Sequence, residues 1–267
     1  MLRGFYTAAS GMMTQQRHQE ALGNNLANIN TPGYKADQAT IRSFPEMLIQ
    51  AQGKKQLPVN RNVHLPISET IGSLNTGVYV QEFVPNFAQG GIRETNIGTD
   101  LAITQDAVPD ETGGIFFRVQ NEAGEERLTR NGNFTIDGNG FLVTNQGYYV
   151  LNNAGTPIET GGRDFTVTDT GMLQTDTETI PLGLAYVNDV NELTKEGDNL
   201  YDGESIAVPA DAEFTVLQGF LEQSNVDAQA TMTDQLNAYR MFELNQRVLR
   251  AYDESLGKAV SDIGRLG

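Results

Sequence analysis

Apolar residues near the start of the chain recur at spacings of three and four positions. The series consists of Leu2, Phe5, Ala9, Met12 and Met13, followed by Leu22, Leu26 and Ile29. This period is that of an amphipathic helix, so a long N-terminal helix is predicted. Pro32 cannot continue a helix and Gly33 is typical of a helix end, so the two residues predict where this helix stops.

A second helical pattern extends from about Ser224 to the end of the chain. Four of its apolar residues lie seven positions apart, with three further residues between them; the set is Phe242, Leu249, Leu256 and Ile263, with Asn245, Tyr252 and Ala259. A repeat of seven predicts a coiled-coil seam. Ser224 and Asp227 resemble a capping box, in which a hydroxyl and a carboxylate satisfy the first N–H groups, so a helix start at Ser224 is predicted.

Between the two helical patterns, apolar residues alternate with polar ones. Alternating runs lie around residues 128, 134–136, 141–143 and 149–151, separated by turns rich in Asn and Gly, and further runs cover residues 165–167, 172–174, 182–187 and 214–220. This pattern predicts short antiparallel strands. Residues 61–90 lack a clear period and contain Pro66 and Pro85, which favours an extended linker.

These patterns together predict an α+β fold. Long N- and C-terminal helices would pair as a coiled-coil-like domain, and a central, mainly antiparallel β domain would lie between them in the sequence. The predicted division is a discontinuous helical domain for polymerisation from residues 1–60 plus 217–267, with an extended arm, a linker at 61–90, and an acidic β domain at 91–216.

Charge and composition exclude several classes of function. The formal net charge is −16, most of it between residues 62 and 220, which would repel nucleic acid and anionic lipid. The chain has no Cys and two His, so it lacks thiolate ligands and nearly all imidazole ligands. We therefore expect no metal, no cofactor and no nucleic-acid partner. We also expect no membrane insertion and no ordinary signal peptide, because no apolar run is long enough.

The N-terminal helix has an unusual polar face. Between residues 4 and 31, Asn, Gln, Ser and Thr are frequent, whereas Arg17 and Glu20 are the only charged residues. A solvated helix face usually contains Lys and Glu, so these amides and hydroxyls favour contact with protein. The alternative is that this helix packs on the C-terminal helix within a monomer and turns its amides to water.

Three groups of residues resemble the bacterial flagellar basal-body rod protein family, of the FlgF and FlgG type and the related FlhO and FlhP type of bacilli. The first group is YTAASGM at residues 6–12 with NNLANINTPGYK at 24–35. The second is LTRNGNF at 128–134 with GFLVT at 140–144, and the third is GFLEQSNVD at 219–227 with residues 240–243 and 253–256.

The resemblance implies a non-catalytic structural subunit of the flagellar rod, most simply of the distal rod. Such a subunit assembles through its terminal helices with copies of itself and with other rod and hook proteins, and transmits torque from motor to hook. It reaches the basal body through the flagellar type III export apparatus without a cleaved signal peptide.

For such a subunit, the expected assembly interface combines both helices and the motif that follows the first helix. Its candidate residues are Leu2, Phe5, Met12, Asn25, Leu26, Asn28, Asn30, Thr31, Pro32, Gly33, Tyr34, Phe242, Leu249, Leu256 and Ile263. A local role competes with this interpretation, because Asn side chains can cap a helix end and residues 31–33 can form the exit turn.

An unrelated function stays open at this point: a secreted β-rich hydrolase or binding module. Asp169-Thr170-Gly171 matches the aspartic-protease tripeptide, but that chemistry needs two carboxylates, and hence a dimer using Asp169. A hairpin turn explains the same residues. Likewise, residues 137–140 suggest a calcium loop less well than a tight turn, and His18 and His64 are better explained as surface or interface residues.

Overall fold

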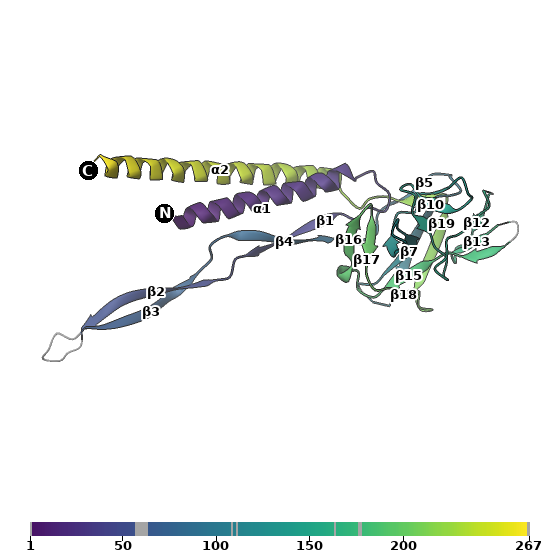
Figure 1. Ribbon diagram of the computed structural model, residues 1–267, viewed down its shortest axis with the longest axis horizontal. Helices are drawn as coiled ribbons and strands as arrows, with labels where there is room; N and C mark the ends of the chain where they lie inside the picture. Colours follow the sequence, from purple (N-terminus) through teal and green to yellow (C-terminus); the bar gives the residue numbers. More distant parts are fainter. Residues whose placement is uncertain are drawn as a thin grey trace. The chain divides into compact units, whose positions relative to one another are not determined.

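Two long helices lie near the ends of the chain in a computed structural model, which describes residues 2–56, 64–107, 109–110, 112–162, 164–175 and 178–265 (Figure 1). Helix α1 covers Leu2–Ala27 and helix α2 covers Ala228–Gly264. The strands of the central region pair in the antiparallel direction. The predicted α+β class and the central antiparallel region are therefore confirmed.

The chain divides into two compact units, each built from separate stretches of sequence. Unit 1 contains Met1–Gly23, Ala39–Phe83 and Met232–Gly267, and unit 2 contains Asn24–Gln38 and Val84–Thr231. The β domain predicted at 91–216 lies inside unit 2, and most of both helices belongs to unit 1. The predicted domain boundaries at residues 60, 90 and 216 stay predictions.

In unit 1, α1 and α2 lie side by side (Figure 1). A Cβ atom added at Gly4 would lie 2.1 Å from the Tyr252 hydroxyl, and one at Gly11 would lie 3.0 Å from Nδ2 of Asn245. The absence of a side chain at Gly4 and Gly11 therefore allows α2 to approach α1. Tyr252 and Asn245 both belong to the seam predicted on α2.

The seam residues of α2 are less exposed than most of the residues around them. Those that the structure describes are half-buried: Phe242, Asn245, Leu249, Tyr252, Leu256 and Ala259. Leu244 and Val248, on a neighbouring side of the helix, are exposed. The side chain of Ile263 lies outside the described residues. The predicted seven-residue pattern thus coincides with the sheltered side of α2, whereas its pairing as a coiled coil stays a prediction.

Unit 1 also contains most of four long strands. Strand β1 (Asp37–Ser43) pairs with β4 (Val78–Pro85), and β2 (Met47–Gln56) pairs antiparallel with β3 (His64–Leu74). The segment predicted as an extended linker at 61–90 therefore includes β3 and β4. Over these two strands the backbone is extended, but it is paired by hydrogen bonds. Prolines did not prevent this, because both Pro66 and Pro85 lie in two-stranded sheets, which have open edges.

Two predicted helix boundaries are wrong by a few residues. Helix α2 begins at Ala228, because the Asp227 carboxylate accepts hydrogen bonds from two backbone N–H groups of the first turn, at 2.8 and 3.1 Å. The Ser224 hydroxyl instead accepts a bond from an N–H group before the helix. Helix α1 ends at Ala27, before Pro32, and the chain continues in hydrogen-bonded turns.

Unit 2 is built from short strands around one main sheet. Nine described strands form this sheet, in the order β16-β17-β8-β7-β11-β10-β9, with β15 pairing to β7 and to β18. The bounds of the elements in unit 2 are β5 (Ile92–Glu94), β6 (Leu101–Ala107), β7 (Gly114–Gln120), β8 (Glu126–Thr129), β9 (Phe134–Ile136), β10 (Leu142–Thr144), β11 (Tyr149–Val150), β12 (Thr166–Val167), β13 (Met172–Gln174), β14 (Thr179–Pro181), β15 (Leu184–Val187), η1 (Val190–Glu192), β16 (Thr194–Gly197), β17 (Leu200–Asp202), β18 (Ile206–Ala207), β19 (Glu213–Gln218) and β20 (Phe220–Glu222).

Strand β7 lies at the centre of the core of unit 2. It pairs with β8, β11 and β15, and its residues are buried on both faces of the sheet. One face contributes Ile115 and Phe117 to the larger apolar cluster, and the other contributes Phe116 to a smaller cluster with Tyr201. Burial on both faces explains why residues 114–117 do not show the alternating pattern of the other strands.

Turns at both suspected chemical motifs have simple structural roles. Asp169-Thr170-Gly171 connects β12 to β13, with Gly171 at φ +79° and its N–H donating to the Thr168 carbonyl at 2.8 Å. The Asp137 carboxylate accepts bonds from the backbone N–H groups of Phe141 and Asn139, and these bonds lower its pKa. Both turns were predicted.

Candidate functional site: a buried charge cluster

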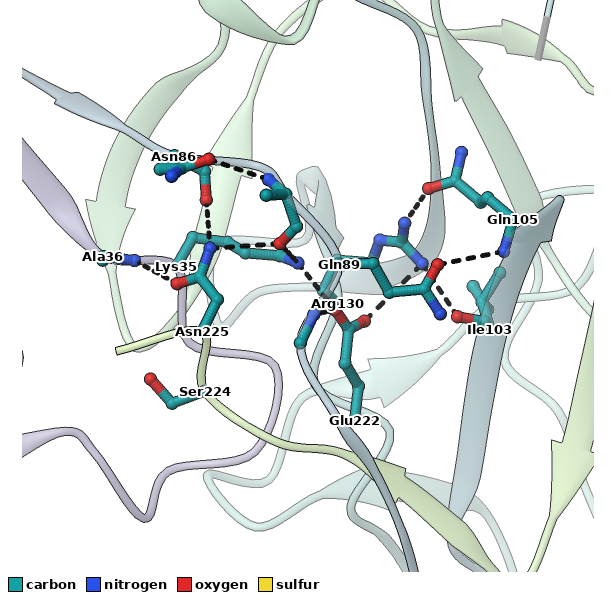
Figure 2. Close-up of polar contacts among 12 residues, drawn as sticks. Lys35, Ala36, Asn86, Gln89, Ile103, Gln105, Arg130, Glu222, Ser224 and Asn225 are labelled. Carbon is teal, nitrogen blue, oxygen red and sulfur yellow. Dashed lines mark hydrogen bonds and ion pairs between the residues drawn. The ribbon is translucent and has the colours of Figure 1, made fainter. Parts of the chain in front are cut away.

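Lys35 and Glu222 form an ion pair in the interior of unit 2. Lys35 Nζ lies 2.7 Å from Glu222 Oε1 and donates a second hydrogen bond to the Ala88 carbonyl at 2.9 Å (Figure 2). Each of the two charged side chains is only 1% exposed. Glu222 Oε1 also accepts the backbone N–H of Gly90 at 2.9 Å. The carboxylate thus joins the segment after α1 to the segment before α2.

Arg130 is the second cation at this site. It follows β8 and is buried, with Nη1 3.7 Å from Glu222 Oε2 and a hydrogen bond to the Ile103 carbonyl at 3.2 Å. The guanidinium also contacts the Gln105 side chain (Figure 2) and lies over the Phe116 ring, 5.6 Å from its centroid. These contacts hold Arg130 in one orientation, as its planar guanidinium allows.

The charges of this cluster do not balance among its described members. Two cations, Lys35 and Arg130, face one carboxylate, and Glu222 Oε2 accepts no hydrogen bond from a described group. Burial lowers the pKa of Lys35, Glu222 opposes this effect, and the nearby charge of Arg130 adds to it. Burial also lowers the pKa of Arg130. Removing such charges from water costs free energy. Stabilisation of the folded chain therefore does not by itself explain why the cluster is present.

Space beside the cluster is too small for a substrate. The cavity that adjoins Glu222, lined also by Asn30, Arg93 and Ser224, has a volume of about 30 Å³. That volume holds about two water molecules. A larger cavity of about 560 Å³ lies elsewhere in unit 2, where the Arg118 guanidinium is already paired with Glu126. Neither cavity presents a nucleophile beside a general base among the described side chains.

Two glycines allow the chain segments around the cluster to approach closely. Gly33 has φ +66°, and a Cβ atom there would lie 2.5 Å from the backbone of Arg130; its N–H donates to the Glu222 carbonyl at 2.8 Å. A Cβ at Gly90 would lie 2.0 Å from the Gln223 carbonyl oxygen. Neither position has room for the side chain of a residue other than glycine.

A polar network connects the last turn of α1 to this site. The Asn25 side chain accepts the Tyr34 hydroxyl at 3.1 Å and the Asp37 N–H at 2.9 Å, and it donates to the Asp37 carbonyl. Lys195 Nζ pairs with Asp37 at 2.8 Å and lies 4.5 Å from the centre of the Tyr34 ring. Burial, together with the Asp37 carboxylate, raises the pKa of Tyr34.

The structure places the predicted interface residues in different environments. Asn25, Gly33 and Tyr34 are buried, and Asn30 is exposed. The side chains of Leu2 and Ile263 lie outside the described residues. The remaining candidates are half-buried, namely Phe5, Met12, Leu26, Asn28, Thr31, Pro32, Phe242, Leu249 and Leu256. A role between subunits stays a prediction for all of these residues.

Local roles are present at two of the Asn candidates. The Asn28 amide donates to the Asn24 carbonyl at 2.9 Å and accepts the Thr31 hydroxyl at 3.1 Å, so it caps the end of α1. Asn25 binds the backbone of Asp37. These are the contacts that the competing local interpretation expected.

Sequence reasoning did not single out the three charged residues of the cluster. A signal was present, because Lys35 is the only charged residue between positions 21 and 36, and Glu222 follows the apolar pair Phe220-Leu221. A lone charge in an uncharged stretch indicates a specific partner. Sequence alone does not show that these residues, distant along the chain, meet at Arg130.

Comparison with known proteins gives each of these residues a family context. The profile described as "Flagella basal body rod protein" matches residues 5–35, "Flagellar hook protein FlgE/F/G D1 domain" matches 112–175, and "Flagellar basal body rod FlgEFG protein C-terminal" matches 217–262. Lys35, Arg130 and Glu222 fall one in each matched segment. The buried cluster is thus the place where the three matched segments meet.

Similar proteins cover the whole chain. It is 38% identical over all of both chains to the flagellar hook-basal body complex protein FlhO of Bacillus subtilis. It is 32% identical to the flagellar basal-body rod protein FlgG of Borreliella burgdorferi, covering 97% of this chain and 98% of the relative. It is 31% identical to the basal-body rod protein FlgF of Caulobacter vibrioides, covering 100% of both.

These relatives contradict the hydrolase alternative, and Asp169 lies in a hairpin turn. Among the described helices, none is both long and apolar enough to cross a membrane. The identity over full-length relatives, together with the three matched segments, places the chain in a structural and non-enzymatic group. It belongs to the family of bacterial flagellar basal-body rod proteins.

Proposed function

We propose that the chain is a subunit of the flagellar rod that associates with copies of itself through its terminal helices. The observation that supports this proposal is the number of large apolar side chains exposed in unit 1. They include Tyr6 and Met13 on α1, Leu236, Tyr239, Met241, Leu244 and Val248 on α2, and Ile41, Phe44, Tyr79 and Phe83 on or beside β1 and β4. Exposed apolar patches of this kind are typical of interaction surfaces.

Helix α2 has apolar residues on more than one side. Met241, Leu244 and Val248 follow the spacing of three and four that forms a stripe, and each is exposed. This stripe is separate from the half-buried seam of Phe242 and Leu249. In the proposed assembly the seam packs with α1 as a coiled coil, and the exposed stripe contacts a second copy.

Aromatic side chains strengthen the case for a contact surface on the strands. Phe44 and Tyr79 stack with ring centroids 5.2 Å apart, and both rings are partly exposed. Aromatic residues are enriched in the central parts of protein interfaces. A contact between a strand surface of one copy and a helix of another joins two different surfaces, and such contacts can repeat into an open helical array.

The finer parts of the proposal rest on the resemblance to flagellar rod proteins. In it, the subunit belongs to the distal rod, contacts other rod and hook proteins, transmits torque from motor to hook, and leaves the cell through the flagellar export apparatus. Asn30, Thr31 and Pro32 contribute to its interface. Electron microscopy of purified basal bodies containing a labelled copy of the chain tests the position, and a label found outside the rod would refute it.

A single substitution tests the association itself. Leu244→Asp places a charge in the exposed stripe, where burial against a second copy would be costly. We expect this variant to leave cells without filaments, although it melts at the same temperature as the unmodified chain. Ser255→Asp, at another exposed position of α2, is the control and should assemble. Normal filaments with Leu244→Asp would contradict the proposed use of this stripe.

A further inference from the structure

We propose that Lys35, Glu222 and Arg130 act as a positioning device, which sets the last turn of α1 and the first turn of α2 in a fixed relation within unit 2. This inference concerns the single chain, and it stands whether or not the chain associates with copies of itself. The residues involved belong to Asn24–Gln38 and Val84–Thr231, which form one compact unit.

On the side of α1, a continuous series of polar contacts leads to the cluster. Asn25 lies in the last turn of the helix and binds Tyr34 and both backbone groups of Asp37. Lys35 lies between Tyr34 and Asp37 in the sequence, and its ammonium group forms an ion pair with Glu222. The Gly33 N–H also donates to the Glu222 carbonyl. The segment after α1 is therefore bound to Glu222 through a side chain and through the backbone.

On the side of α2, the contacts are made by Asn225, three residues after Glu222. Asn225 accepts the Ala36 N–H at 2.8 Å and donates to the carbonyls of Asn86 and Ala88, at 2.7 and 3.0 Å (Figure 2). The Ala88 carbonyl is also an acceptor for Lys35. Asp227, two residues after Asn225 in the sequence, caps α2. The start of α2 is thereby connected to the exit of α1.

Charge gives this junction a specificity that apolar packing would lack. Apolar residues of similar volume often stabilise a core as well as a buried ion pair does, but they tolerate shifted arrangements. Here Lys35 Nζ has two acceptors and Glu222 Oε1 has two donors, all between 2.7 and 2.9 Å. Any shift of one segment along the other would leave a charge buried without a partner, which is strongly unfavourable.

The surplus cation indicates which variant can test this idea. Lys35→Met removes one cation, and Arg130 then balances Glu222, so unit 2 should still fold. The natural chain has no Cys, which allows clean labelling. Ala27, in the last turn of α1, and Ala230, in the first turn of α2, are both exposed. Spin labels on cysteines at these two positions report the distance between the helix ends by pulsed electron resonance.

We expect the labelled chain to give one narrow distance peak, and the Lys35→Met variant to lose that peak while it keeps a cooperative melt. Arg127→Met is the control, because it removes a cation from the surface ion pairs with Glu196 and Glu125 in the same unit; it should keep the narrow peak. A folded Lys35→Met variant with the peak intact would overturn the proposal. A variant without a cooperative melt would also overturn it, since the cluster would then be a determinant of stability only.

Discussion

In unit 2 four of the described charged side chains are buried, three of them in one cluster, whereas in unit 1 large apolar side chains are exposed. Lys35, Arg130 and Glu222 have little contact with water, but Leu236 is 60% exposed and Tyr6 is 63% exposed. Each arrangement is costly in a single chain in water. The two costs have different explanations, since buried charge specifies an internal arrangement and exposed apolar surface provides area for contact with another molecule.

This comparison separates the residues that order the chain from those that we propose join it to a second copy. Substitutions in unit 2 should change the free energy of unfolding and leave the contact surfaces intact. Substitutions of exposed apolar residues in unit 1 should change association and leave unfolding nearly unchanged. The charges, glycines and helix caps of unit 2 allow this separation to be tested.

The largest effect is expected at the only carboxylate of the cluster. Glu222→Gln leaves Lys35 and Arg130 buried with no opposite charge among their described neighbours, and it should lower the free energy of unfolding by about 3–5 kcal/mol. Lys35→Met removes hydrogen bonds but leaves a balanced pair, so it should cost only about 1–3 kcal/mol. Urea titrations followed by circular dichroism measure both. Equal losses of unfolding free energy in Glu222→Gln and Lys35→Met would mean that the cluster has no surplus positive charge.

The next effect is expected at Gly33, where the backbone is left-handed. Gly33→Ala should cost at least about 1–2 kcal/mol for this conformation, with more for the clash of its Cβ with the Arg130 backbone. Gly23→Ala is the matched control, because Gly23 is helical and has no described atom within 4 Å of an added Cβ. It should stabilise α1 by about 0.5–1 kcal/mol. Thermal melts that give both substitutions the same sign would contradict this account.

A smaller effect distinguishes the observed helix cap from the predicted one. Asp227→Ala removes the acceptor of two N–H groups in the first turn of α2 and should cost about 1 kcal/mol. Ser224→Ala should cost less, because this hydroxyl accepts a bond outside the helix. Melts of the two variants measure the difference. A larger loss with Ser224→Ala would restore the helix start that the sequence predicted.

The sequence predicted those parts of the fold that depend on local pattern. The period of three and four gave α1, the period of seven gave the sheltered side of α2, and the strand-like runs between Asn- and Gly-rich turns gave about half of the strands of unit 2. The cap of α2 was misplaced because Ser224 and Asp227 both have side chains that can cap, and only their tertiary contacts decide between them. Strands β3 and β4 were missed because strands of a two-stranded ribbon need not alternate in burial.

The candidate site was less predictable, because it depends on contacts between distant segments. Lys35 and Glu222 are separated by most of the chain, and nothing in the local pattern around Glu222 indicates an ion pair with Lys35. The motif residues Asn25, Gly33 and Tyr34 were assigned to an interface between subunits. In the structure all three are buried, and they arrange the interior around Lys35. A distinct motif therefore indicates residues that make specific contacts, but the pattern does not say whether those contacts lie within the chain or between subunits.

The last and smallest effect concerns pH, and it tests the burial of Tyr34. Burial and the Asp37 carboxylate raise the pKa of this phenol above its ordinary value of about 10, so the folded chain holds the proton more tightly than the unfolded chain does. Its contribution to stability is therefore complete below pH 10 and is lost as the pH rises from there through the folded pKa.

Absorbance titration of the phenols should show Tyr34 among those that ionise late in the folded chain, and Tyr34→Phe should remove one phenol from that late group. In urea all nine tyrosines should ionise together near pH 10. If Tyr34→Phe leaves the late group unchanged, Tyr34 is accessible to water, and the internal connection between Asn25 and Lys35 does not hold in solution.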